Sequence, residues 1–265
     1  MRVLVTNDDG VEAPGIRFLA LALADAGEDV VVAAPSNEAS GMGAAMTAVE
    51  EDGRIVVAAH ELDGLDGVEA YGVAGSPAFI ALIATRGAFG PPPDLVFSGI
   101  NRGANAGIAV LHSGTVGAAF TAAENGSRAM AVSLDVLSAG AASAASGGAA
   151  AVRPAGDDER RHWETAAAIA AALLPTVKDL PEGTVLNLNV PDLPRDAVKG
   201  VRQARLARFG QVSMAVAERG RDYVRTALEQ STARLEEGTD LALLADGYAT
   251  VTAVRAVTEV DFELP

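Results

Sequence analysis

The chain has 265 residues, 49% of them hydrophobic but only 4% aromatic, so it can bury a substantial core and is too apolar to be disordered. Its formal net charge of −15 and pI of about 4.5 make nucleic-acid duplexes and anionic membranes poor partners and cations good ones. The absence of cysteine excludes disulfides and thiolate catalysis, and no apolar run reaches the ~18 residues that span a bilayer. The N-terminus shows no signal-peptide pattern, so we expect a soluble, cytoplasmic protein.

The acidic excess has a second feature. Lysine occurs only at Lys178 and Lys199, and arginine supplies the other basic residues. High negative charge, few lysines and a core of small side chains favour a halophilic protein, adapted to high salt. The alternative is an ordinary acidic enzyme encoded by a GC-rich genome.

Strands and helices alternate along the first 135 residues. A short apolar strand at 3–6 is followed by a helix over 14–26 and by an all-apolar strand at 30–34 that Pro35 ends. Continuous apolar runs are typical of parallel strands covered on both faces. The later elements are strands at 54–58, 69–73, 95–97, 129–134 and 184–190, and helices over 77–87 (with Ser76 as N-cap), 113–125 and 158–174. The alternation predicts an α/β, Rossmann-like fold with a doubly wound, mostly parallel sheet.

Two segments break this rhythm. Residues 138–156 are Ala, Ser and Gly almost throughout, and we expect a flexible surface insertion that is dispensable for activity. Residues 199–265 mix short strands with a helical turn near 240–246 and lack the alternation. We therefore predict a catalytic core over 1–190 and an irregular C-terminal subdomain over 191–265 that serves oligomerisation.

The most informative segment is Asn7-Asp8-Asp9-Gly10, which directly follows the first strand. Ligands of open α/β sheets bind where strands end. Two adjacent carboxylates repel each other and also any phosphate at the next helix N-terminus, and a divalent cation resolves both conflicts. The turn therefore indicates a hard-metal site for phosphate chemistry, although Asp is also a favoured turn and N-cap residue. The adjacency of Asp8 and Asp9 argues against aspartyl-phosphate phosphatases, which need an Asp-x-Asp pair.

A dinucleotide-binding fold is a weaker interpretation. Gly41-Met42-Gly43 does not continue to a glycine at position 46, which is Met46, and the first strand–helix turn carries carboxylates where that fold carries glycines. The second strand ends at Pro35 without an acid for a ribose. We therefore do not expect a cofactor-binding dehydrogenase.

Three further loops carry residues that suit the same metal and phosphate chemistry. The hydroxyl of Ser40 and the amide oxygen of Asn101 can complete an oxygen ligand set, and the amide of Asn105 can point towards a phosphate. Ser113-Gly114-Thr115 begins a helix whose backbone N–H groups can bind an anion. Each has a plain alternative: turn chemistry for the asparagines, an N-cap for Ser113, and a strand-end histidine for the neighbouring His112.

Taken in order, these segments resemble the SurE family of metal-dependent nucleotide phosphatases. The resemblance covers about residues 1–135. The matching motifs are Thr6-Asn7-Asp8-Asp9-Gly10, Ala13-Pro14-Gly15, Ala34-Pro35, Ser40-Gly41-Met42-Gly43, Gly75-Ser76-Pro77-Ala78, Ser98-Gly99-Ile100-Asn101-Arg102-Gly103-Ala104-Asn105 and Ser113-Gly114-Thr115-Val116. Weaker echoes are Leu188-Asn189-Val190-Pro191, Gly238-Thr239-Asp240-Leu241 and Gly247-Tyr248. The chain departs from the family pattern at Ala44, Ser76 and His112, and these departures bear on substrate preference.

The resemblance implies a 5'-nucleotidase that hydrolyses nucleoside monophosphates with one divalent cation, Mg²⁺ or Mn²⁺, per subunit. It implies metal ligands at Asp8, Asp9, Ser40 and Asn101, and phosphate contacts at Asn7, Gly41, Asn105, Ser113, Gly114 and Thr115. An oxygen ligand set fits these hard ions. Asp8 and Asp9 are the expected catalytic residues, one of them orienting the attacking water. The resemblance also implies a homodimer or homotetramer.

Two other functions share these sequence features. A metal-dependent nucleotide-binding or sensing module without turnover would have the same site residues. A metal-free Rossmann-type binder would leave the acidic turn without a role. Phosphate release from nucleotides distinguishes an enzyme from both.

Overall fold

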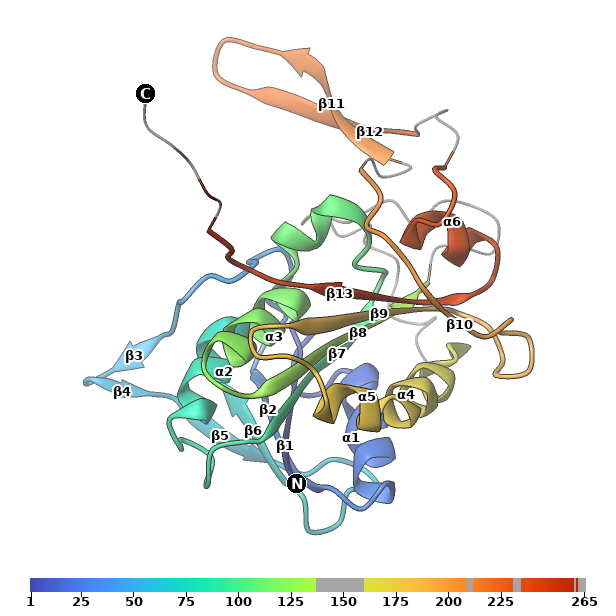
Figure 1. Ribbon diagram of the computed structural model, residues 1–265. Coiled ribbons are helices and arrows are strands. Elements are labelled where there is room, and N and C mark those ends of the chain that lie inside the picture. Colours follow the sequence, from blue (N-terminus) through green and yellow to red (C-terminus); the bar gives the residue numbers. More distant parts are fainter. Residues whose placement is uncertain (137–159, 209–211, 231–234, 260, 262–265) are drawn as a thin grey trace.

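The computed structural model describes residues 1–136, 160–208, 212–230, 235–259 and 261. Its centre is a nine-stranded sheet with the order β10-β13-β9-β8-β7-β1-β2-β6-β5 (Figure 1). Its strands are β1 (Arg2–Thr6), β2 (Asp29–Pro35), β5 (Val57–His60), β6 (Glu69–Val73), β7 (Leu95–Arg102), β8 (Arg128–Asp135), β9 (Val185–Pro191), β10 (Val201–Gln203) and β13 (Ala249–Val254). Only β5 against β6 and β13 against β9 are antiparallel pairs in this sheet. The predicted α/β fold with a doubly wound, mostly parallel sheet is confirmed.

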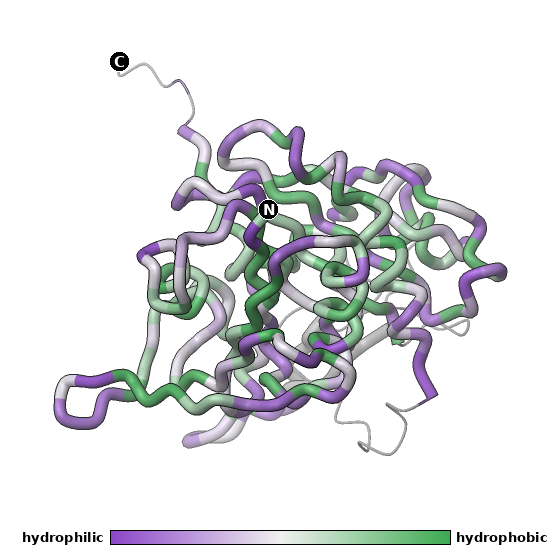
Figure 2. The backbone as a smooth tube through the Cα atoms, turned by 90° about the horizontal axis from the view of Figure 1, so that it is seen from below, coloured by the Kyte–Doolittle hydropathy of each residue, from purple (hydrophilic) through white to green (hydrophobic). Residues whose placement is uncertain are grey.

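Helices cover both faces of the sheet. One face carries α1 (Pro14–Asp25), α4 (Trp163–Ala172) and α5 (Leu174–Lys178), and the other carries α2 (Pro77–Thr85) and α3 (Gly114–Glu124) (Figure 1). Side chains alternate along each strand, so Val3 and Val5 of β1 pack with the first group and Leu4 packs with the second. The central strands are therefore buried on both sides. Figure 2 shows this arrangement as hydrophobic strands in the interior and hydrophilic residues in the outer loops.

The order in which successive strands join the sheet reverses between β1 and β7. β2 and β6 follow on one side of β1, and β8 and β9 follow on the other side of β7. Thr6 of β1 pairs with Ser98 of β7, so the chain leaves β1 beside the last residues of β7. Ligands bind at such a switch point in open α/β sheets. The segments that carry Asp8, Asp9 and Asn101 therefore meet where the fold favours a ligand.

Residues after 191 lie both inside and outside this sheet. β10 and β13 extend it beyond β9, and α6 (Asp240–Ala245) packs near them. β11 (Val212–Arg219) and β12 (Val224–Gln230) form an antiparallel hairpin that projects from the core (Figure 1). Strands from both sides of residue 190 share one sheet, and the division into a core and an oligomerisation subdomain stays a prediction.

The strand predicted at 54–58 is two shorter pieces. β4 (Arg54–Ile55) pairs with β3 (Glu50–Glu51), and β5 begins only at Val57 to pair with β6. The turn between β3 and β4 is Asp52-Gly53, with φ of 50° and 72°. Positive φ at both central residues is typical of a type I′ hairpin, for which Asp-Gly is a strong sequence signal. That dipeptide could have revealed the hairpin.

Ser76 occupies the predicted N-cap position of α2, but its hydroxyl does not cap the helix. It donates to the carbonyl of Ala45 and accepts from the N–H of Thr47 at 3.1 Å. Pro77 at the first helical position has no N–H to satisfy, which lowers the need for a cap. The hydroxyl instead fixes the loop that precedes β3.

Three remaining predictions have different outcomes. His112 ends η1 (Gly107–His112), a 3₁₀ helix, and does not end a strand, because the chain turns into this helix before α3. The insertion at 138–156 lies outside the described residues, and its dispensability stays a prediction. Among the described residues, no helix is both long and apolar enough to cross a bilayer.

Candidate active site

The turn after β1 is closed by Asn7. The amide nitrogen of Asn7 donates to the carbonyl of Gly10 at 2.9 Å, and its amide oxygen accepts from the N–H of Gly10 at 3.1 Å. Asn7 is completely buried. Asn7 therefore positions the turn and fixes the direction in which Asp8 and Asp9 leave the strand. Its amide nitrogen carries a second hydrogen, so the predicted phosphate contact of Asn7 stays a prediction.

The carboxylate of Asp8 is buried against the N-terminus of α3. Its Oδ1 accepts a hydrogen bond from the hydroxyl of Thr115. Burial raises the pKa of Asp8, although the hydrogen bonds from Thr115 lower it. A Cβ at position 114 would lie 2.7 Å from Oδ2 of Asp8, so only glycine permits this approach. Gly114 and Thr115 therefore hold Asp8 at the end of the helix, where the helix dipole favours negative charge.

Asp9 is less buried than Asp8 and faces open space. Its Oδ2 accepts from the N–H of Arg102 at 3.1 Å. Burial and repulsion from Asp8 raise the pKa of Asp9 from 3.8 to about 7. Asp9 lines a cavity of about 180 Å³ together with Glu38, Arg102 and Trp163. The two carboxylates are thus unequal: Asp8 is fixed by the helix, and Asp9 borders a cavity that a small molecule or ion can enter.

Asn101 and Ser40 lie on segments that touch the Asp8–Asp9 turn. The amide nitrogen of Asn101 donates to the carbonyl of Gly103 at 2.6 Å, which leaves the amide oxygen for another partner. Asn101 directly precedes the Arg102 N–H that binds Asp9. The exposed Ser40 donates to Oε1 of Glu38 at 2.8 Å, and the N–H of Ala39 beside it donates to the Asp8 carbonyl at 2.8 Å.

These donors suit a hard divalent cation. They comprise two carboxylates, an amide oxygen and a hydroxyl, and oxygen sets of this kind fit Mg²⁺ or Mn²⁺. Among the described residues, no group of three or more His, Asp or Glu side chains is placed to hold a metal ion, so the amide and hydroxyl oxygens would have to complete the set. The raised pKa values of Asp8 and Asp9 mark a place where a cation would offset burial and mutual repulsion.

Some of the predicted phosphate-binding groups already form hydrogen bonds within the protein, and others remain available to a ligand. Ser113 is the N-cap of α3, and its Oγ accepts from the N–H three residues on at 3.1 Å, as its plain alternative predicted. The amide nitrogen of Asn105 donates to Oγ of Ser133 at 2.9 Å. An amide nitrogen carries two hydrogens, so one remains for a phosphate. Gly41 is exposed, with a φ of 77° that a glycine adopts readily.

Two buried asparagines of β9 hold the Asn105 loop, and their roles were not predicted. Asn187 and Asn189 donate to the carbonyl of Asn105 at 2.8 and 3.0 Å, and Asn189 also accepts its N–H at 2.8 Å. Both are completely buried. Residues two apart in a strand point to the same face. An Asn-x-Asn pair inside an apolar strand was therefore an available signal for a polar network.

Asp240 forms a second unpredicted anchor, which we call the Asp240 clamp. Its carboxylate accepts from the backbone N–H groups of Gly107 at 2.7 Å, Ala207 at 3.0 Å and Leu241 at 2.8 Å, and its side chain is completely buried. The N–H of Ile108 donates to the carbonyl of Ala207 at 3.0 Å. The clamp thus fixes η1, which joins the Asn105 loop to Ser113. The motif Gly238-Thr239-Asp240-Leu241 contained the residue, but only the fold places it beside this loop.

Comparison with known proteins identifies the family. The family described as Survival protein SurE matches residues 3–213. A 5'-nucleotidase SurE of Nitratidesulfovibrio vulgaris (strain Hildenborough) is 38% identical, covering 96% of this chain and 93% of the relative, and one of Desulfitobacterium hafniense (strain DCB-2) is 36% identical, covering 97% and 91%. The crystal structure of the SurE protein from Aquifex aeolicus matches with a TM-score of 0.72 at 29% identity, over 96% of this chain and 93% of that one. The chain therefore belongs to the SurE family, as its motifs predicted.

Proposed function

We propose that this protein is a 5'-nucleotidase that hydrolyses nucleoside monophosphates with one divalent cation, Mg²⁺ or Mn²⁺, per subunit. The Asp8–Asp9 turn carries the proposal, because two carboxylates with raised pKa values lie at the switch point of the sheet and beside the N-terminus of α3. The names of relatives that are 36–38% identical over nearly the whole chain favour turnover over a sensing module.

We assign the cation to Asp8, Asp9, Ser40 and Asn101. When bound, it would hold a phosphate oxygen, offset developing negative charge and lower the pKa of a water molecule. Thr115 keeps Asp8 in place as the fixed ligand. Asp9 borders the 180 Å³ cavity, which supports it as the carboxylate that orients the attacking water.

The remaining phosphate contacts fall to groups around the start of α3. The free hydrogen of the Asn105 amide, the Gly41 N–H and the N–H groups of the segment 113–115 would bind phosphate oxygens that the cation leaves. The water oxygen bonds to phosphorus, Asp9 takes up its proton, and the ester P–O bond breaks. The nucleoside oxygen leaves with the bonding electrons and takes up the proton that Asp9 accepted, which restores the Asp9 carboxylate. No covalent intermediate is needed.

Phosphate release tests this proposal. AMP and GMP are incubated with the protein in Mn²⁺, Mg²⁺ or EDTA, and free phosphate is measured. We expect release with either cation and none in EDTA. Nucleotide binding without release under any of these conditions would favour the sensing module.

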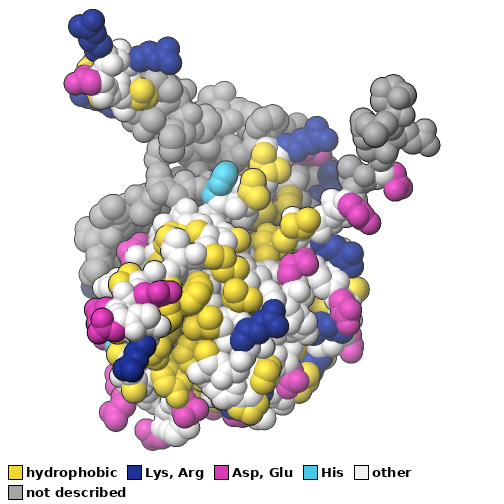
Figure 3. All heavy atoms as spheres, turned by 90° about the vertical axis from the view of Figure 1, so that its left-hand side faces the viewer, with side chains coloured by type: hydrophobic (Ala, Val, Ile, Leu, Met, Phe, Trp, Pro, Cys, Tyr) yellow, Lys and Arg dark blue, Asp and Glu magenta, His cyan; other side chains and the backbone are white. Residues whose placement is uncertain are grey.

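We also propose a homodimer or homotetramer that works in the cytoplasm. The face in Figure 3 carries a band of hydrophobic side chains, and Tyr223 and Val224 of the projecting hairpin are exposed. A band of apolar side chains on a surface is typical of interaction sites. Light scattering at working salt should give at least the mass of two chains, and a fully active monomer at micromolar concentration would contradict the assembly.

A further inference from the structure

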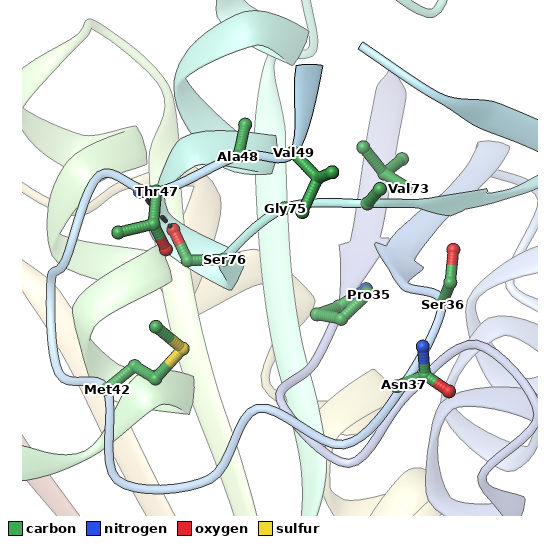
Figure 4. Close-up of a pocket in the computed structure, with 11 residues that line it drawn as sticks. Pro35, Ser36, Asn37, Met42, Thr47, Ala48, Val49, Val73, Gly75 and Ser76 are labelled. Carbon is green, nitrogen blue, oxygen red and sulfur yellow. Dashed lines mark hydrogen bonds between the residues drawn. The ribbon is translucent and has the colours of Figure 1, made fainter. Parts of the chain in front are cut away.

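An apolar hollow lies beside the candidate active site, at the carboxyl ends of β2 and β6. It has a volume of about 270 Å³, and residues of the loop 36–49 line its edge (Figure 4). Pro35, Val73 and Val49 supply apolar walls, and Met42 points into the enclosed space from the loop. Asn37 adds a polar amide at the rim. We call this space the β2–β6 hollow.

The hollow is preformed, because its loop is tied at several points. The N–H of Ser36 donates to the Val73 carbonyl at 2.9 Å, and the N–H of Val49 donates to the Ala74 carbonyl at 2.8 Å. Between these ends, the hydroxyl of Ser76 bonds to the loop carbonyl of residue 45 and to the N–H of residue 47. Ligand binding therefore costs little conformational entropy in this loop, because the loop is already ordered.

The same loop connects the hollow to the carboxylate turn. The N–H of Ala39 donates to the carbonyl of Asp8 at 2.8 Å. On its other side the loop touches α3, since a Cβ at Gly117 would lie 2.5 Å from the carbonyl oxygen of Gly43. The phosphate end of the candidate site and the hollow thus border the same loop.

We propose that the β2–β6 hollow binds the base of the nucleoside monophosphate. This inference rests on the proposed function. Aliphatic side chains and a methionine suit the faces of a planar heteroaromatic ring, since thioethers make favourable contacts with such rings. The amide of Asn37 can donate to or accept from the ring edge. The volume is slightly below the roughly 300–1,000 Å³ of drug-sized pockets, which suits one base.

The test compares substrates that differ only in the base. AMP and GMP carry a base, and ribose 5-phosphate presents the same kind of primary phosphate ester without one. Val49→Gln puts a longer polar side chain at a position that is 60% exposed, so it leaves the core intact. The matched control is Val201→Gln on β10, at the far end of the sheet and 42% exposed. Met42→Ala removes a wall of the hollow and is the second variant.

We expect Val49→Gln to lower kcat/KM for AMP and GMP about tenfold, or ~1.4 kcal/mol, while ribose 5-phosphate stays within about twofold. Met42→Ala should act in the same direction by about threefold, a loss of apolar contact, and Val201→Gln should change nothing. An equal fall for all three substrates, or unchanged turnover of AMP in both variants, would overturn the proposal.

A binding measurement separates this inference from the proposed function. Calorimetric titration with adenosine needs no turnover. Adenosine should bind the wild type and Val201→Gln equally, and Val49→Gln at least about fivefold more weakly, in line with the loss expected for AMP. Equal binding to all three proteins would place the base elsewhere. If no phosphate is released from any substrate while adenosine binding shows this pattern, the proposed function fails and the base site stands.

Discussion

Two buried acidic sites, the Asp8–Asp9 turn and the Asp240 clamp, meet the same electrostatic problem in different ways. Three backbone N–H groups surround the carboxylate of Asp240, so the protein itself supplies its hydrogen-bond donors. Asp9 instead has a second carboxylate beside it, and repulsion from Asp8 is one of the causes that raise its pKa to about 7. The difference teaches that burial alone does not mark a catalytic carboxylate. A carboxylate that the fold leaves next to another, facing a cavity, is the better candidate.

The largest expected effect comes from removing one charge of the turn. Asp9→Asn should lower phosphate release by about a hundredfold or more, because it removes a ligand charge from a site that depends on electrostatic stabilisation. Affinity for Mn²⁺, measured by calorimetry, should fall with it. The folded protein should persist, since the neutral amide relieves the repulsion from Asp8. Full activity of Asp9→Asn, or activity undiminished by EDTA, would contradict the assignment of these residues as metal ligands.

The Asp240 clamp should give a smaller and different effect. Asp240→Asn leaves at most one good acceptor where two carboxylate oxygens bind three N–H groups. Without these hydrogen bonds η1 should move and shift the loop that carries Asn105. We therefore expect KM to rise about tenfold, which corresponds to a loss of ~1.4 kcal/mol in substrate binding. The values of kcat and of the Mn²⁺ affinity should stay nearly unchanged. Circular dichroism checks that the variant folds.

Thr239→Ala is the control for that experiment. Thr239 caps α6 through its hydroxyl, which accepts from the N–H of Ala242 at 3.4 Å, and it does not take part in the clamp. Losing the cap should cost about 1 kcal/mol of stability and leave KM unchanged. If the two variants raise KM equally, the clamp has no specific role in positioning the loop.

Most of the fold could be predicted from sequence, because it follows from local patterns. Apolar runs such as 30–34 and helix signals such as Pro14 and Pro77 gave the elements and the doubly wound sheet. The strand error at 54–58 arose because its ends pair with different partners. Which partner a strand takes is a long-range property that local patterns do not encode.

The candidate site likewise has features that local sequence patterns predict and features that only long-range contacts fix. Asp8 and Asp9 follow β1, and Asn101 lies near the end of β7, after its apolar residues 95–97, so their common location could be predicted from parallel strand ends. The unequal surroundings of Asp8 and Asp9 depend on Thr115, which is 107 residues from Asp8. The clamp joins Asp240 to Gly107, which is 133 residues away. Contacts at such separations, and a polar hydroxyl such as Ser76 that chooses a loop over a helix cap, are fixed only by the packed fold.

Exposed carboxylates differ from both buried sites, because their mutual repulsion should depend on salt concentration. Glu50, Glu51 and Asp52 at the β3–β4 hairpin are all exposed, and the whole chain has a net charge of −15. Screening length falls from ~10 Å at 0.1 M to ~3 Å at 1 M salt, which relieves repulsion among exposed charges but hardly affects buried ones. We expect Tm to rise steeply between about 0.1 and 2 M KCl, in wild type and Asp9→Asn alike. An equal Tm at both salt concentrations would mean that the protein is not halophilic.

The last expected effect is the pH dependence of Tm in the metal-free protein. The pKa of Asp9 is raised from 3.8 to about 7, so the folded state retains a proton that the unfolded chain releases near pH 4. The stability due to this proton is fully present below about pH 4 and is lost as pH rises through about 7. In EDTA, Tm of the wild type should therefore fall from about pH 5 to pH 8 relative to Asp9→Asn, whose amide stays neutral, by roughly 5 °C. Glu51→Gln, at an exposed position, should keep the wild-type slope. Parallel melting curves for wild type and Asp9→Asn would show that Asp9 holds no such proton, and the protein itself would then have to stabilise the Asp9 charge, as backbone N–H groups do for Asp240.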